Sequence, residues 1–137
     1  MNAPLPTERQ VQRGILSMIG TCFPRVFVTH VPNGAHLAGN QTARFKQIGA
    51  LKGDGLKVGF PDLLCLWRGT GALLECKRPK LGRLTPEQKA MHDRLDGVGW
   101  PVAVVTSIDE AYVHLRSRGA PWAGIDPRVN ANDEWSV

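Results

Sequence analysis

Two short apolar runs on either side of a glycine-rich segment constrain this fold more than any other feature of the sequence. The runs are Asp62–Trp67 and Ala72–Lys77, and the segment between them is Arg68-Gly69-Thr70-Gly71. Apolar runs of this length around closely spaced glycines are typical of a β-hairpin. The hairpin carries charged residues at its open end, which is unusual for strands that are otherwise so apolar.

The charged residues of this hairpin are expected to meet on one face. Side chains alternate between the two faces of a β-strand, so Glu75 and Lys77 share a face. If Gly69-Thr70 forms the two-residue turn, Asp62 lies opposite Lys77 and joins that face. Two carboxylates and an ammonium group are costly to bury without a partner or a metal ion. The alternative is a structural ion pair between Asp62 and Lys77 at the margin of the sheet.

Three helices are predicted from their start signals. Thr7, Thr85 and Ser107 are each followed three residues later by Gln or Glu, which is the pattern of a capping box. Glycines close to the far ends supply stop signals. The predicted helices span residues 7–19, 86–96 and 108–117.

Two further strands are predicted from β-branched and apolar runs. The first is Val26–Val31, and the second is Val102–Thr106, whose unbroken apolar character is typical of a strand covered on both faces. Between them, Ala38–Leu51 allows a short helix, and Lys52–Gly59 is expected to be a flexible loop. This order of elements predicts an α/β fold with a mixed central β-sheet flanked by helices.

Positive charge is concentrated in the middle of the chain. The whole sequence has a net charge of +5, whereas residues 44–83 contain nine basic and three acidic residues and carry +6. A basic centre on a small domain favours an anionic polymer, usually nucleic acid, as the partner. The alternative is a solvated basic face that only maintains solubility.

Membrane and disulfide-rich classes are disfavoured by the composition. Uninterrupted apolar runs such as Val102–Val105 are far shorter than the ~20 residues that span a bilayer. No secretory leader is recognisable, so we expect an intracellular, cytoplasmic protein without a membrane partner. The three cysteines lack CxxC spacing, which indicates neither a disulfide framework nor a zinc site.

The spacing of the hairpin acids matches a catalytic pattern. Pro61-Asp62 is followed after twelve residues by Glu75-Cys76-Lys77, and this arrangement resembles the PD-(D/E)xK signature of nucleases. Carboxylate oxygens suit a hard divalent cation such as Mg²⁺. A lysine beside them can help to orient and deprotonate the attacking water.

The flanking residues narrow the resemblance to one family within that superfamily. The matching stretches are, in order, Glu8, Val31-Pro32-Asn33-Gly34, Gly55…Gly59-Phe60-Pro61-Asp62-Leu63, Leu74-Glu75-Cys76-Lys77, Gly82-Arg83-Leu84-Thr85-Pro86-Glu87-Gln88 and Ser107-Ile108-Asp109-Glu110-Ala111. In these stretches the chain resembles the VRR-NUC family, in its free-standing type. The resemblance implies a restriction-endonuclease-like core in a nuclease domain at 1–119, with 120–137 as an irregular C-terminal tail.

The resemblance also assigns roles to five residues. It implies that Asp62 and Glu75 are metal ligands, that Lys77 is the catalytic lysine and that Glu8 is an accessory acid of the metal site. Gln88 would lie at the edge of the site. Two of these residues have simpler alternatives, because Gln88 can be only a capping-box partner and Glu8 only an acid favoured by the helix dipole.

Polar and basic residues around the hairpin are expected to contact the backbone of the nucleic acid rather than its bases. They are Asn33, Gly34, His36, Arg44, Lys46, Lys52, Lys57, Arg78, Lys80 and Arg83. The remaining histidines, His30, His92 and His114, have no metal-ligand spacing and are expected to be structural.

Together these features predict a Mg²⁺- or Mn²⁺-dependent endonuclease that hydrolyses DNA phosphodiesters. Resemblance to the free-standing members of the family implies structure-selective cleavage of branched DNA such as four-way junctions, and hence a homodimer. DNA shape, dimerisation or a protein partner would then select the target. The alternative is a non-catalytic nucleic-acid-binding module of the same fold, for which the Asp62, Glu75 and Lys77 set would have no use.

Overall fold

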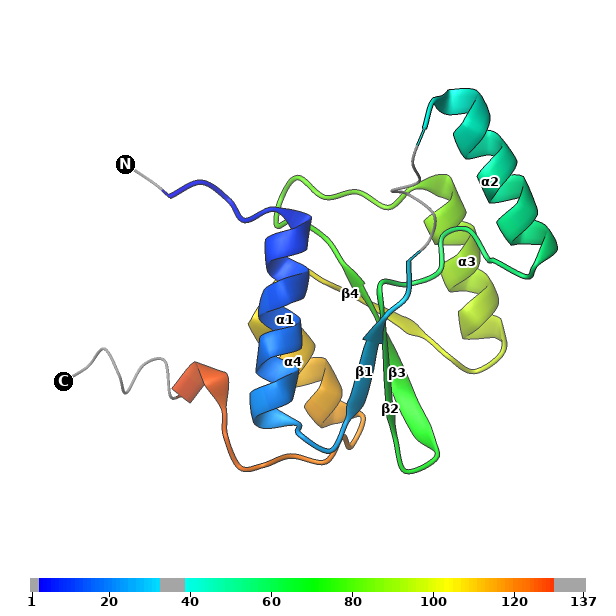
Figure 1. Ribbon diagram of the computed structural model, residues 1–137. Helices are drawn as coiled ribbons and strands as arrows, with labels where there is room; N and C mark the ends of the chain where they lie inside the picture. Colours follow the sequence, from blue (N-terminus) through cyan, green and yellow to red (C-terminus); the bar gives the residue numbers. More distant parts are fainter. Residues whose placement is uncertain (1–2, 33–38, 130–137) are drawn as a thin grey trace.

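The computed structural model describes residues 3–32 and 39–129, which form four helices and a four-stranded sheet (Figure 1). The elements are α1 (Glu8–Cys22), β1 (Phe27–His30), α2 (Gln41–Gly53), β2 (Leu63–Trp67), β3 (Thr70–Cys76), α3 (Pro86–Gly97), β4 (Val102–Val105) and α4 (Ile108–Ser117). The strands lie in the order β1-β2-β3-β4, and only the pairing of β3 with β4 is parallel. The predicted α/β fold with a mixed sheet and flanking helices is confirmed.

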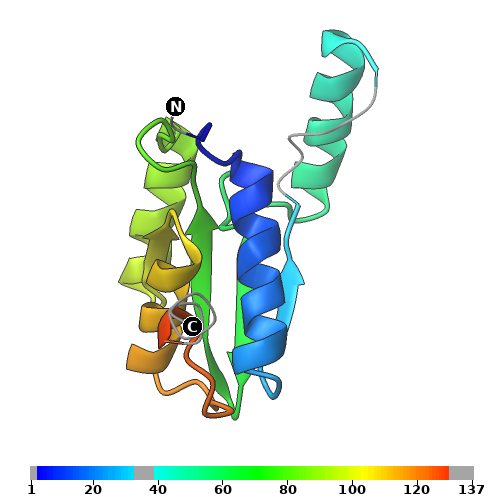
Figure 2. The ribbon, with the colours of Figure 1, turned by 90° about the vertical axis from the view of Figure 1, so that its left-hand side faces the viewer.

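Helices cover both faces of the sheet. α1 and α4 lie on one face, and α3 lies on the other (Figures 1 and 2). The main core forms between the sheet and the α1–α4 layer, where Ile15, Leu74 and Leu115 are fully buried. β3 is buried along almost its whole length because it is an inner strand with helices on both sides. An acid on this strand therefore points into a covered layer.

The helix start signals act largely as predicted. The capping boxes at Thr7 and at Thr85 are both complete. The third start differs, because Ser107 caps the backbone N–H of Glu110 while the Glu110 carboxylate accepts from the backbone N–H of Thr106. The predicted capping box at Ser107 is therefore wrong in its second half, although the helix begins where expected.

The turn of the hairpin lies one residue earlier than predicted. Trp67 pairs with Thr70, so Arg68 and Gly69 form the turn, with φ values of 43° and 77°. Positive φ at both central residues is what a tight hairpin turn with the right twist requires. The correction shifts the register by two residues, which leaves every side chain on its predicted face. Continuing this register brings Asp62 opposite Glu75 rather than Lys77.

β4 contacts both α4 and α3, which lie on opposite faces of the sheet, but it is covered less completely than its sequence suggested. It lies at the edge of the sheet, and the side chain of Val104 is 44% exposed. An unbroken apolar run is typical of a strand in a parallel pair, and β4 does pair in parallel with β3. The run does not indicate whether another strand pairs with the second edge of β4.

The ambiguous segment before the hairpin forms a helix that stands apart from the other elements (Figure 2). α2 is capped by Asn40, whose Oδ1 accepts from the backbone N–H of Ala43 at 2.8 Å. None of its residues is buried. It includes Lys52 and Gly53, so the predicted loop at 52–59 is wrong at its first two residues. In the described ranges, no helix is long and apolar enough to cross a membrane.

The segment after α4 packs against the rest of the chain as far as residue 129. Ala120 is buried, and the backbone N–H of Ala123 donates to the carbonyl of Cys22 at 2.9 Å. The guanidinium of Arg116 lies 3.5 Å from the ring centroid of Trp122. The boundary between the domain and the tail at residue 119 stays a prediction.

Candidate active site

Asp62 is fixed at the open end of the hairpin. It directly precedes β2, and its Oδ2 accepts a hydrogen bond from the backbone N–H of Cys76 at 2.8 Å. Cys76 is the last residue of β3, so this bond ties the start of one strand to the end of the next. The half-buried Asp62 side chain is thereby held beside the acid that precedes Cys76.

Glu75 is the most deeply buried charged residue of the described chain, with 0% of its surface exposed. Its Oε1 lies 3.1 Å from Nε2 of His92, on α3. Its Oε2 is buried and has no hydrogen-bond partner among the described residues. A buried oxygen that accepts no hydrogen bond is costly when the carboxyl group is ionised, and either a proton shared with Asp62 or a bound cation can offset that cost.

Burial controls the protonation of this pair. Burial raises the pKa of Glu75 to about 9, the nearby Asp62 adds to the rise, and the charge of Lys77 opposes it. Burial also lowers the pKa of His92, and the charge of Lys77 acts in the same direction. Without a bound cation, the contact between Glu75 and His92 at neutral pH is therefore a hydrogen bond between two neutral groups rather than an ion pair.

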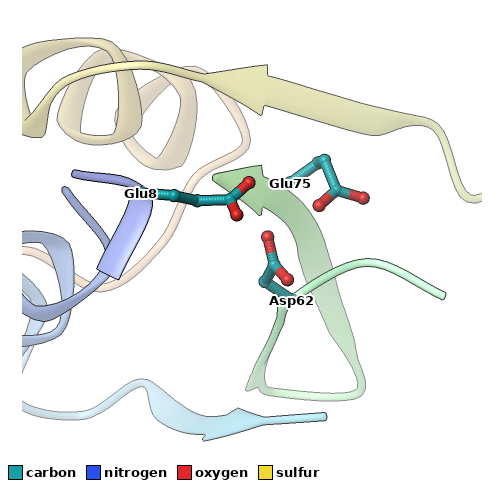
Figure 3. A group of neighbouring side chains, drawn as sticks. All are labelled: Glu8, Asp62 and Glu75. Atoms are coloured by element: carbon teal, nitrogen blue, oxygen red, sulfur yellow. The ribbon is translucent and has the colours of Figure 1, made fainter. Parts of the chain in front are cut away.

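Three carboxyl groups from different parts of the chain converge beside this contact (Figure 3). Glu8 comes from the first turn of α1, Asp62 from the start of β2 and Glu75 from the end of β3. One oxygen from each lies within 4.8 Å of the others. The structure thus brings together all three residues that the sequence suggested as metal ligands.

Lys77 lies at the border of this acidic cluster. Its side chain is 10% exposed, and its Nζ is 3.2 Å from Oε1 of Glu8. Its backbone N–H donates to the carbonyl of Val105 at 3.0 Å, which holds the end of β3 against β4. The ion pair of Lys77 is therefore with Glu8, and not with Asp62 as the structural alternative had supposed.

Two glycines allow the loops around the cluster to approach other elements closely. A Cβ on Gly59 would lie 2.6 Å from the carbonyl oxygen of Glu87, at the start of α3. A Cβ on Gly82 would lie 2.8 Å from that of Lys77. Neither distance is possible for real side chains, so these positions require glycine. They explain two of the glycines on which the family resemblance depends.

The loop after β3 also fixes the amino end of α1. Nε of Arg78 donates to the carbonyl of Pro6 at 3.1 Å, across a large separation in sequence. Pro6 lies two residues before Glu8. Arg78, which the sequence suggested as a DNA contact, therefore also holds the segment that delivers Glu8 to the cluster.

Gln88 and His92 both belong to α3, and they differ in whether they contact the acidic cluster. Gln88 is 7% exposed, and its Oε1 accepts from the backbone N–H of Thr85 at 2.9 Å, as the capping alternative predicted. His92 was expected to be structural, but it contacts Glu75 directly. The available signal was its position four residues after Gln88, which places both on one face of the helix.

The other described residues that were predicted to contact DNA are exposed basic side chains, which we call the basic surface. Arg44, Lys46 and Lys52 are exposed on α2, and Lys57, Lys80 and Arg83 are exposed in the loops on either side of the hairpin. Arg83 donates to the carbonyls of Lys80 and Gly82, which shapes its loop. Asn33, Gly34 and His36 lie outside the described residues.

The donor set of the cluster fits a divalent metal ion. Carboxylate oxygens are the ligands that hard cations such as Mg²⁺ and Mn²⁺ prefer. Three of them lie within reach of one point, and the second oxygen of Glu75 still needs a partner. A bound cation would supply that partner and offset the repulsion among the carboxylates.

Comparison with known proteins places the chain in a family and a fold. The family model of the VRR-NUC domain matches residues 6–109, a range that includes Glu8, Asp62, Glu75 and Lys77. A solved structure described as a VRR_NUC domain protein aligns with a TM-score of 0.60 and 24% sequence identity, covering 84% of this chain and 89% of that chain. At that identity the likeness shows a shared fold. No curated protein matches the chain.

Proposed function

Because the chain belongs to the VRR-NUC family, a nuclease-type domain family, we propose that it is a metal-dependent nuclease that hydrolyses DNA phosphodiester bonds. The observation that carries this proposal is the convergence of Glu8, Asp62 and Glu75 beside Lys77. A protein that only bound DNA would gain nothing from three acids gathered at a basic surface, because they repel phosphate. We take residues 1–119 as the nuclease domain and 120–137 as its tail.

We infer that the three acids hold Mg²⁺ or Mn²⁺. When bound, such an ion activates water as a Lewis acid and neutralises charge that develops on the phosphoryl oxygens. Glu75 must lose its proton to act as a ligand, since a coordinating carboxylate is ionised. Lys77 lies at the border of the cluster, where its amine can orient the attacking water and assist its deprotonation. Gln88, at the start of α3, would line the edge of the site.

The basic surface would bind the DNA backbone. We assign this role to the residues that the sequence suggested. Those of them that the structure shows as exposed lie on α2 and in the loops on either side of the hairpin. Arg44, Lys46 and Lys52 share α2 with no acidic residue. Contacts of this kind position a duplex without reading its sequence, which suits an enzyme that recognises the shape of DNA.

We also propose that the enzyme cleaves branched DNA as a homodimer. The described chain holds one such acidic cluster, whereas resolution of a four-way junction needs two opposed nicks. A twofold dimer supplies two equivalent sites on one substrate. Light scattering at micromolar concentration tests this, and a monomer that resolves junctions fully would contradict it.

Cleavage of a panel of labelled substrates tests the proposed function. The panel holds a duplex, a flap, a splayed arm, a four-way junction and a single strand, each with Mg²⁺ and with Mn²⁺. We expect cleavage that requires the cation and is fastest on branched substrates. Equal cleavage of all substrates would remove the structure selectivity, and binding without any cleavage would favour the non-catalytic module.

A further inference from the structure

His92 lies where it can control the orientation of Glu75. It is on α3, which covers the face of the sheet opposite to α1 and α4 (Figure 1). Its side chain is 13% exposed, and its Nε2 is 3.1 Å from Oε1 of Glu75. His92 is not one of the three residues whose ligand atoms meet within 4.8 Å. It therefore touches the acidic cluster only through one of its members.

The two oxygens of Glu75 have different environments. Oε1 is engaged by His92, whereas Oε2 is buried without a hydrogen-bond partner among the described residues. A carboxylate with a donor on one oxygen cannot rotate freely about its terminal bond. Partners of this kind orient metal-ligating groups in proteins, and their loss typically weakens metal binding by about 10–100-fold.

We propose that His92 is a positioning residue, which donates from Nε2–H to Oε1 of Glu75 and so leaves Oε2 as the oxygen that receives the cation. The inference rests on the proposed function, because it presupposes that Glu75 is a metal ligand. A neutral imidazole has one N–H, and the contact requires that this hydrogen sits on Nε2. The orientation of the Glu75 carboxylate therefore depends on a hydrogen-bond donor at this position and not on the bulk of the ring.

Three substitutions separate the donor from the bulk. His92→Gln places an amide nitrogen near the position of Nε2 and keeps the donor. His92→Asn keeps a polar amide, but its nitrogen falls near the position of Nδ1, too far from Glu75. His92→Leu fills the space without any donor. A cooperative unfolding transition of each variant, measured without metal, establishes that the variant is folded. If the Leu variant does not fold, the comparison of the Gln and Asn variants is sufficient for the test.

Calorimetric titration with Mn²⁺ alone measures the effect without any DNA or cleavage. We expect His92→Asn and His92→Leu to weaken Mn²⁺ binding by about 10–100-fold, and His92→Gln to retain the wild-type affinity. Wild-type affinity in His92→Asn, or an equal loss in His92→Gln, would overturn the positioning role. In that case a loss of Mn²⁺ binding in Glu75→Ala would still support the proposed metal site. Absence of Mn²⁺ binding to the wild type would overturn both proposals.

Discussion

For single residues, the proposed metal site implies that a proton and a cation compete for Glu75. Burial and the neighbouring Asp62 raise its pKa to about 9 from an ordinary 4.5, so the metal-free protein holds this proton at neutral pH. We predict that the affinity for Mn²⁺ rises with pH from about 6 to about 8, by up to about tenfold per pH unit, because each ion displaces one proton. Titration calorimetry at a series of pH values measures this. An affinity that does not change with pH would contradict the assignment of Glu75.

The same shift in pKa sets how the stability of the metal-free protein depends on pH. A group whose pKa is raised on folding contributes stability that is fully present below its unfolded pKa and is lost as pH rises through its folded pKa. For Glu75 that window runs from about 4.5 to about 9. The contribution of Glu75 to the free energy of unfolding should therefore fall across this range, and Mn²⁺ should offset the loss at its alkaline end.

Asp62 combines a proposed catalytic role with a structural one, and two substitutions separate them. Asp62→Asn keeps an oxygen that can accept from the backbone N–H of Cys76, whereas Asp62→Ala leaves that donor unpaired. We predict that both variants lose cleavage and that only the Ala variant loses stability, by about 1 kcal/mol. Urea denaturation measures the difference. Equal stability of the two variants would show that the bond to Cys76 contributes little.

The sequence could predict which acids would meet, but not all of their contacts. Asp62, Glu75 and Lys77 are linked by one hairpin, so the two-residue period of a strand is enough to place them on one face. His92 belongs to α3, which follows the hairpin in the chain, and no local pattern specifies how such a helix is rotated against a sheet. The contact of His92 with Glu75 therefore became visible only in the structure.

Among the elements, a glycine allows the loop before β2 to lie directly against the start of α3. Gly59 has a φ of 84° and its Cβ position lies 2.6 Å from the carbonyl oxygen of Glu87, whereas Gly55 has a φ of 106° with no atom near its Cβ position. We predict that Gly55→Ala costs about 1–2 kcal/mol through backbone strain alone. Gly59→Ala should cost clearly more, about 3 kcal/mol, because overpacking adds to the strain.

Denaturant unfolding of the two variants tests this comparison, and Gly55→Ala is the matched control. We also expect Gly59→Ala to reduce cleavage, since the displaced loop leads directly to Asp62. Equal destabilisation in the two variants would mean that the close approach to Glu87 relaxes without cost.

The elements themselves were largely predictable, and their limits were less so. The helix starts at Thr7 and Thr85 have capping-box sequences, and both capping boxes form completely in the structure. The hairpin turn was misplaced by one residue, because a glycine-rich segment offers several turns and the observed one places Arg68 at positive φ. A basic residue at that position is uncommon, so the sequence favoured a different pair.

For the molecule as a whole, we predict that the basic surface dominates DNA affinity. Substitution of Lys52, Lys57, Lys80 and Arg83 by Gln should reduce the dependence of log affinity on log salt by up to about one unit for each phosphate that no longer meets a cation. Filter binding at several salt concentrations measures this slope. Arg25 and Arg68, which are exposed beyond the far end of α1 and in the turn of the hairpin, are the matched controls. A larger change in the controls would place the DNA elsewhere.

The layered architecture was predictable because alternating helix and strand signals leave few ways to cover a sheet. The position of α2 was not, since none of its residues is buried. The sequence also did not distinguish edge strands from inner strands, because the apolar composition of β4 is the one expected of an inner parallel strand. Long-range order in the sheet depends on pairing, which a single sequence does not display.

Glu8, Asp62, Glu75 and Lys77 are proposed to form a metal-dependent hydrolytic centre. The most direct measurement is single-turnover cleavage of a labelled four-way junction by the wild type and by Asp62→Asn, Glu75→Gln and Lys77→Ala, with Mn²⁺ and with EDTA. We predict that the wild type cleaves only with the cation, and that each variant binds the junction but cleaves it at least about 100-fold more slowly. Full activity in any one variant, or cleavage by the wild type in EDTA, would contradict the account.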